Sequence, residues 1–137
     1  MKSKLLKEGP QKVYALVFET GDEVVEGLSR FASEKHLSAS HFTGLGALRD
    51  VEVGFFDFGR KDYDRTLIDE QVEVVSLVGD VALNGTEPQV HPHIVVAKRD
   101  GTAYGGHLMK AHVKPTLEVI ITETPAHLCK SNVKRCL

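Results

Sequence analysis

Three histidines in the segment VHPHIVVAKRDGTAYGGHL, residues 90–108, have the type and spacing of metal ligands. His91 and His93 are two positions apart in an apolar run. In a strand, residues at this spacing point to the same side and lie roughly 6.6 Å apart. Two imidazoles at that separation can tilt toward one ion and bind it at about 2.1 Å. The pair therefore indicates a candidate metal site, with ordinary polar residues on a hairpin as the alternative.

The register of the predicted hairpin decides whether His107 joins this pair. A loop of three residues, Arg99–Gly101, or of five residues, Lys98–Thr102, places His107 opposite His93. A two-residue loop, Asp100–Gly101, turns His107 to the other face, because a shift by one residue exchanges the two faces of a strand. Whether the three histidines lie on one face therefore depends on the length of this loop.

The apolar pattern of the hairpin favours the two odd-length loops. They place four apolar residues together on one face and leave the histidines on the other: Ile94, Val96, Tyr104 and Leu108. Pro92 has no backbone N–H to donate, which indicates the rim of a sheet and access for solvent. Gly105 and Gly106 are expected to leave space beside His107 for a metal or a ligand.

Three histidine ligands leave the fourth position of a tetrahedral zinc ion open, as in catalytic zinc sites. We therefore predict that His91, His93 and His107 bind zinc or another divalent transition metal. Glu118, on the next predicted strand, is a candidate general base or ligand-orienting residue if that strand pairs beside His107. A solvated strand residue is the alternative for Glu118. His41 is a further candidate to approach the site.

The elements that must position these residues are one helix and about seven strands. The helix is predicted over residues 23–37, with Asp22 as its cap, because its apolar residues form one helical stripe. Residues 59–66 are expected to form a loop or hairpin tip. The strands are predicted over residues 12–19, 38–48, 51–58, 71–83, 89–98, 102–109 and 116–124. Gly44 and Gly46 suggest a bulge or a close backbone approach. The pattern predicts an α+β domain dominated by an antiparallel sheet.

The length and composition of the chain predict a single domain over residues 1–137, with a core from about 12 to 124 and a tail over 125–137. The net charge of −2 is a poor match for a domain that mainly neutralises phosphates. A local basic patch could lie in the tail, with a solvated tail as the alternative: Lys130, Lys134 and Arg135. Cys129 and Cys136 form no zinc or disulfide pattern, which suggests a reducing compartment.

Several predicted strands are apolar on both faces, and one helix covers only part of one face. We therefore expect a homo-oligomer. No apolar run approaches the roughly 18 residues of a transmembrane helix. We also expect no membrane association and a cytoplasmic location.

The order of these segments resembles the PPC domain (plant and prokaryote conserved domain) from Lys12 to Glu123. The most specific matches are EVVSLVG at Glu73–Gly79 and DGTAYGGHL at Asp100–Leu108. The resemblance implies a compact α+β fold that assembles as a homotrimer through apolar strand surfaces. Bacterial and archaeal members are described as predicted DNA-binding proteins, and DNA is a partner here by this analogy. Plant members carry a separate AT-hook, whose Arg-Gly-Arg-Pro core this sequence lacks.

The histidine spacing is also similar to the zinc site of acetolactate decarboxylase, whose fold looks related. This similarity extends the metal hypothesis to His91, His93 and His107, but it does not extend the decarboxylase activity. Two functions follow. The first is a trimeric DNA-binding or regulatory module with a three-histidine metal site. The second is a small zinc-dependent enzyme, lyase- or hydrolase-like, whose small carbonyl-containing ligand binds at the metal.

Overall fold

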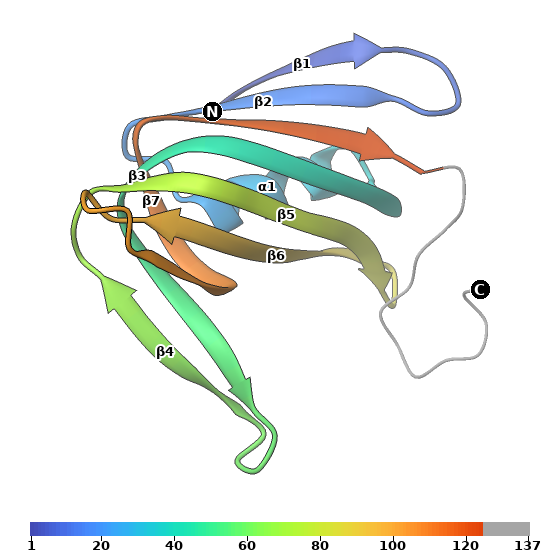
Figure 1. Cartoon of the computed structure of the whole chain (residues 1–137). Helices are drawn as coiled ribbons and strands as arrows, with labels where there is room; N and C mark the ends of the chain where they lie inside the picture. Colours follow the sequence, from blue (N-terminus) through green and yellow to red (C-terminus); the bar gives the residue numbers. More distant parts are fainter. Residues whose placement is uncertain (125–137) are drawn as a thin grey trace.

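The computed structural model describes residues 1–124, which form one helix and seven strands (Figure 1). The elements follow in the order β1 (Lys2–Lys7), β2 (Val13–Glu19), α1 (Val24–Glu34), β3 (Ala39–Asp57), β4 (Asp62–Ile68), β5 (Val72–Asn84), β6 (Glu87–Ala97) and β7 (Ala103–Glu123). The predicted α+β class is confirmed. The predicted tail, with its two cysteines and its basic cluster, lies outside the described residues.

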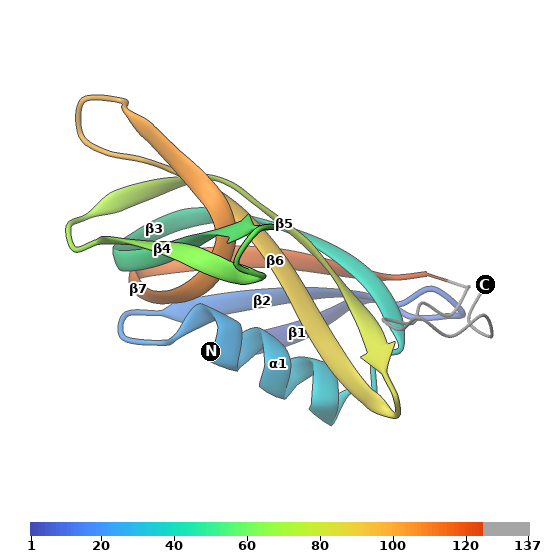
Figure 2. The same ribbon diagram turned by 90° about the horizontal axis from the view of Figure 1, so that it is seen from below.

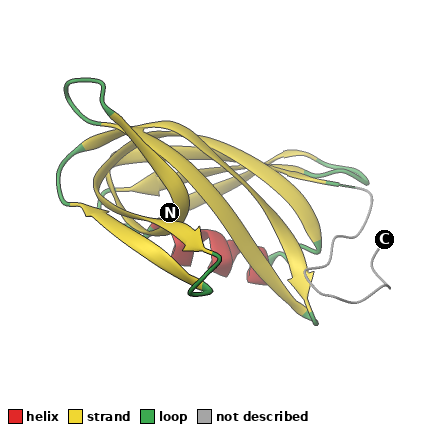
Figure 3. Ribbon diagram, turned by 60° about the horizontal axis from the view of Figure 1, so that its bottom comes forward, coloured by secondary structure: helices red, strands yellow, loops and turns green. Residues whose placement is uncertain are grey.

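The strands form one antiparallel sheet in the order β1-β2-β7-β6-β5-β3-β4. Strand β3 also pairs with β7, so β7, β6, β5 and β3 follow one another in a closed circuit. Figure 2 shows α1 lying along one side of these strands. Figure 3 shows how strongly the sheet twists. The circuit brings the middle of β6 beside the start of β7, where the histidines lie.

Two pairs of predicted strands are continuous in the structure. Residues 38–48 and 51–58 fall almost entirely within β3, and residues 102–109 and 116–124 fall almost entirely within β7. Gly44 and Gly46 form the predicted bulge, because the β3–β5 register shifts between them. A Cβ on Gly46 would lie 2.3 Å from the Thr116 carbonyl oxygen of β7. The predicted bulge and close backbone approach are both confirmed.

Two strands are absent from the sequence prediction. Every residue of β1 is exposed, so neither face of this strand has to be apolar. Its sequence, KSKLLK, accordingly lacks the alternation by which the other strands were predicted. The stretch 59–66 was expected to form a loop or hairpin tip. Its first residues do form the tip of the β3–β4 hairpin, but β4 takes up the rest, so the expectation is only partly right. The polar residues of β4 suggested a turn, but they pair with β3 from Asp62 to Ile68. The total of seven strands therefore agrees because two missed strands offset two mergers.

Helix α1 begins one residue later than its predicted cap implies. Its N-cap is Glu23, whose carboxylate accepts hydrogen bonds from the backbone N–H groups of Val25 and Glu26 at 3.1 and 3.0 Å. Asp22 instead accepts from the backbone N–H of Glu19 at 2.9 Å, so the prediction of Asp22 as the cap is wrong. The longer Glu side chain satisfies the free N–H groups of the first turn. α1, the one helix of the described residues, is too short to cross a membrane.

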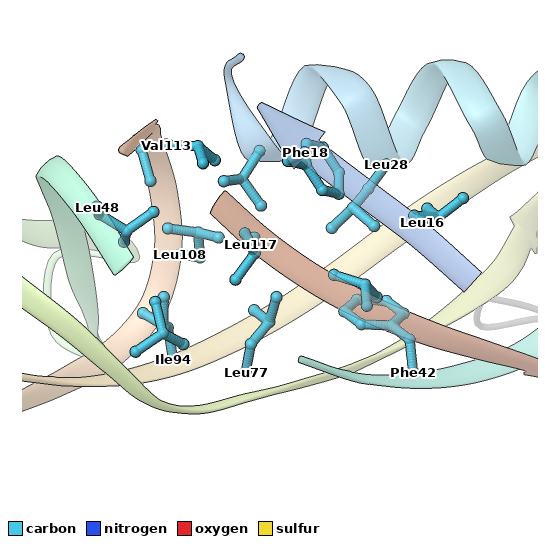
Figure 4. Close-up of a cluster of buried hydrophobic side chains, with 14 of the residues drawn as sticks. Leu16, Phe18, Leu28, Phe42, Leu48, Leu77, Ile94, Leu108, Val113 and Leu117 are labelled. Atoms are coloured by element: carbon cyan, nitrogen blue, oxygen red, sulfur yellow. The ribbon is translucent and has the colours of Figure 1, made fainter. Parts of the chain in front are cut away.

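The core lies between α1 and the inner side of the curved sheet. Figure 4 shows the apolar side chains that meet there, among them Phe18, Leu28, Phe42, Leu77 and Leu117. All five are almost fully buried. Residues that alternate with these strand positions point to the opposite side of the sheet. Several large apolar residues on that side remain exposed in this chain.

Candidate metal centre

Three imidazole rings converge at the junction of β6 and β7. His91 and His93 come from β6, and His107 comes from the first part of β7. One ligand atom from each residue lies within 4.8 Å of the other two. The ring centroids are 4.9 Å apart for His91–His93, 5.4 Å for His91–His107 and 5.7 Å for His93–His107. The predicted convergence of these side chains is confirmed, while the metal remains a prediction.

The loop between β6 and β7 places His107 on the same face as the other two histidines. His93 pairs directly with His107, and the last pair of the ladder is Ala97 with Ala103. The connection is the five-residue loop Lys98–Thr102, in which the Lys98 N–H donates to the Thr102 carbonyl at 2.9 Å. Asp100 Oδ1 accepts from the Thr102 backbone N–H at 2.9 Å, which helps lower the pKa of Asp100. One of the two favoured loop lengths is therefore realised.

The site opens to solvent on the β6 side. The β6–β7 ladder begins at His93, so His91 and Pro92 lie beyond it with β5 as their neighbour, as Pro92 predicted. His91 and His93 are exposed and His107 is half-buried. Neutral imidazole nitrogens are good ligands for zinc and other late transition metals. The donor set thus fits such an ion, and three protein ligands would leave further coordination positions open to solvent.

Tyr63 forms the wall of the site beside His107. Their ring centroids are 5.1 Å apart, and the ring planes are inclined by 35°. Gly54 of β3 pairs with His107, and a Cβ on Gly54 would lie 2.8 Å from Tyr63 Cδ1 and 2.9 Å from Met109 Sδ. The absence of a side chain at Gly54 therefore allows the Tyr63 ring to lie beside His107. The sequence did not point to Tyr63 as a site residue, because its segment was expected to form a loop or hairpin tip.

The two glycines before His107 have a packing role in addition to the one expected. A Cβ on Gly106 would lie 2.5 Å from the Gly54 carbonyl oxygen. A Cβ on Gly105 would lie 2.9 Å from the Ile94 carbonyl oxygen. Both glycines are required because neighbouring backbone approaches closely. Both glycines also line a hollow beside His93, so they leave space near the candidate ligands as well.

Asp80 is an acidic neighbour of the site that sequence reasoning missed. It pairs with His91 across the β5–β6 ladder, and Val78 pairs with His93. Paired residues in an antiparallel ladder share a face, so the half-buried Asp80 side chain lies on the same face as the histidines. On its other side Asp80 pairs with His41 of β3. The alternation along β5 was enough to place Val78 and Asp80 on one face of that strand. The sequence did not show how β5 aligns with β6, so the pairing of Asp80 with His91 could not be predicted.

Glu118 and His41 do not join the group of metal-ligating atoms found among the described residues. Glu118 pairs with Leu45 on one side and Val17 on the other. Strands β3 and β5 lie between this part of β7 and β6, because β7 pairs with β6 only over its first residues. The predicted role of Glu118 depended on its strand pairing beside His107. That condition is therefore not met within one chain.

A shallow hollow of about 170 Å³ adjoins the histidines. Val78 and Val95 form apolar walls, and His93 lies at its edge. The other lining residues are Ser76, Ile94, Gly105 and Gly106. The arrangement offers room for a small molecule beside one of the three candidate metal ligands.

Comparison with known proteins gives a family match over nearly the whole described chain. Residues 6–125 match the model of the Plants and Prokaryotes Conserved (PCC) domain. A candidate DNA-binding protein from Ralstonia eutropha JMP134 has 29% sequence identity and a TM-score of 0.80, covering 90% of this chain and 85% of that one. A metal-containing protein from Archaeoglobus fulgidus has 27% identity and a TM-score of 0.81, covering 98% and 92%.

Two further similarities cover only part of the related protein. The bifunctional protein GlmU of Synechococcus sp. (strain JA-3-3Ab) is 29% identical over 121 residues, which cover 87% of this chain. The match spans only 18% of that relative's length. Acetolactate decarboxylase from Bacillus subtilis strain 168 has 13% identity and a TM-score of 0.57, covering 89% of this chain and 57% of that one. This likeness confirms the related fold and says nothing of activity.

Proposed function

Since the chain belongs to the Plants and Prokaryotes Conserved (PCC) domain family, we propose that it is a trimeric regulatory module with a metal centre. His91, His93 and His107 would hold the metal, which is zinc or another divalent transition metal. The observation that carries the proposal is that three ligand atoms lie within 4.8 Å of one another on two paired strands. The metal-containing relative from Archaeoglobus fulgidus supports it. A cytoplasmic location remains part of the proposal.

Elemental analysis tests the metal centre directly. The protein is purified without a histidine tag, dialysed against buffer with trace zinc, and analysed for metal per chain. We expect one divalent ion per chain in the parent protein. A parent protein that retains no ion, while its circular dichroism spectrum shows that it is folded, contradicts the metal centre.

Assembly into trimers is supported by the exposed apolar surface of the single chain. Leu45, Val75, Val78 and Ile120 are large apolar residues that remain exposed on the side of the sheet away from the core. Contiguous apolar surface of this kind on a soluble domain marks an interaction site. Light scattering coupled to size-exclusion chromatography measures the mass, and a monomeric parent contradicts the trimer.

DNA is proposed as a partner because relatives such as the Ralstonia eutropha protein are candidate DNA-binding proteins. The net charge of −2 requires that any such surface be a local concentration of cations. Fluorescence anisotropy with a labelled duplex tests this partner. Binding through phosphates weakens by a factor of about 10³ or more between 50 and 200 mM salt when six or more phosphates are contacted. Absence of binding at low salt contradicts the DNA partner without affecting the metal centre.

A second candidate function is favoured by the hollow beside His93. A zinc ion with open coordination positions supplies Lewis acidity and lowers the pKa of bound water. The hollow of about 170 Å³, walled by Val78 and Val95, could hold the apolar part of a small carbonyl-containing ligand. The chain would then be a lyase- or hydrolase-like enzyme. Turnover of small carbonyl compounds by the metal-loaded protein, with the His93→Ala variant as control, distinguishes the two, since only the enzyme converts its ligand to a product.

A further inference from the structure

The hairpin formed by the end of β3 and by β4 projects away from the rest of the sheet (Figure 1). We term residues 52–67 the arm. Phe58 is 86% exposed and Phe55 is 74% exposed, and Leu67 also lies largely in solvent. Removing such side chains from water is favourable roughly in proportion to the apolar area buried. The arm therefore presents several large apolar groups that a binding partner would remove from water.

The charged groups of the arm are largely satisfied within the arm itself. Arg60 forms ion pairs with Asp57 and Asp64, and Arg65 Nη1 lies 2.9 Å from Glu52 Oε1. Backbone N–H donation from Arg60 is the main reason that the pKa of Asp57 lies below its ordinary value. Cations already paired in this way are poorly suited to contact phosphates. An apolar and uncharged protein surface complements the arm better.

Such a surface is present elsewhere on the same chain. A groove of about 340 Å³ runs over β3, β5 and β7 on the side of the sheet away from the core. We term this groove the outer face. It is lined by Thr43, Gly44, Leu45, Val75, Ser76, Leu77, Val78 and Ile120. None of these lining residues carries a charge. Leu45 is 63% exposed, so the arm of the same chain does not cover it.

From this complementarity we propose that the arm of one copy packs into the outer face of the next copy. The contact joins two different surfaces, and head-to-tail contacts of this kind produce rings when the rotation closes. The inference rests on the proposed trimer and specifies which surfaces meet in it. It also relates assembly to the metal centre: Tyr63 of the arm lies against His107, and Val78 of the outer face pairs with His93. Both subunit contacts therefore flank the candidate metal site.

Two single substitutions and their mixture test this contact. Phe58→Glu introduces a charge on the arm, and Leu45→Glu introduces a charge on the outer face. Each variant alone is expected to have the mass of a single chain by light scattering. In the mixture, the intact arm of the Leu45→Glu chain binds the intact outer face of the Phe58→Glu chain. The expected product is a one-to-one pair with twice the mass of a chain, which cannot grow further because its other two surfaces are defective.

Other outcomes of the experiment overturn the inference. An arm variant that retains the mass of the parent shows that the arm is not part of the contact. A mixture of two monomeric variants that stays monomeric shows that the arm and the outer face do not bind each other. Leu67→Glu and Val75→Glu serve as a second pair, and circular dichroism verifies the folding of all four. A monomeric parent contradicts the proposed trimer as well, whereas a trimeric parent with an unaffected arm variant contradicts this inference alone.

Discussion

His93 and His107 face each other across the β6–β7 ladder, with ring centroids 5.7 Å apart. The ladder continues from this pair to Ala97 and Ala103. The pairing of the two strands therefore fixes the backbone positions from which both rings extend. His91 lies two residues before His93, on the same face. A site held in this way is positioned by regular backbone and does not depend on a flexible loop.

His93→Ala and His107→Ala are each expected to remove the bound metal, because two imidazoles are too few to hold zinc tightly at a solvent-exposed rim. Elemental analysis after dialysis measures the loss. The melting temperature without metal should stay close to that of the parent, since neither side chain belongs to the apolar core. His41→Ala is the matched control and should retain metal. Retention of one ion per chain in both test variants would place the metal elsewhere.

Asp80→Asn is expected to weaken metal binding by a factor of about 10, because a carboxylate beside a metal-binding histidine orients the ring and increases its basicity. The register that pairs Asp80 with His91 motivates this prediction. Competition titration with a chromophoric chelator measures the affinity. Glu118→Gln is the matched control, since Glu118 pairs with Leu45 and Val17 and should leave the affinity unchanged. A loss with Glu118→Gln but not with Asp80→Asn would reverse these assignments.

Gly46→Ala is expected to destabilise the fold by about 3 kcal/mol, since overpacking against fixed backbone is costly. The added Cβ would lie 2.3 Å from the Thr116 carbonyl oxygen and 2.6 Å from the Leu117 Cα. Gly59→Ala is the control, because its nearest contact, at 3.2 Å, is the Asp57 side chain. Urea denaturation measures both free energies of unfolding. Equal stability of the two variants would show that β7 moves aside readily.

Asp50→Asn is expected to make stability less dependent on pH at the acid end. Burial raises the pKa of Asp50, but hydrogen bonds from His112 and Arg49 outweigh it and hold the pKa below the ordinary value of 3.8. A lowered pKa stabilises the fold above the unfolded value, and this stabilisation is lost as pH falls through the folded pKa.

The Asp50→Asn variant should therefore be less stable than the parent at pH 7, by about 1.5–3 kcal/mol for hydrogen bonds to a charged group. The difference should shrink as the pH falls below 3.8, the ordinary value for this carboxyl group. Urea midpoints at pH 7, 5 and 3 measure it. A difference of constant size over this range would show that the charge of Asp50 does not stabilise the fold.

Local pattern alone was sufficient for several features of this protein. Side chains alternate along a strand, so the spacing of His91 and His93 was enough to place both on one face. The apolar residues of the hairpin then favoured the register that brings in His107. The helical stripe of α1 and the bulge at Gly44 and Gly46 were likewise predictable, because both reflect short-range geometry.

Only the tertiary structure decided which distant residues meet at the site. Local pattern left the loop at Lys98–Thr102 as one of two acceptable lengths. It did not show that Tyr63 belongs to a strand beside His107, that Asp80 pairs with His91, or that β3 and β5 separate Glu118 from β6. The physical reason is that β3 and β7 are held as long continuous strands by pairing with each other. The register of such pairing depends on bulges and core packing over the whole chain.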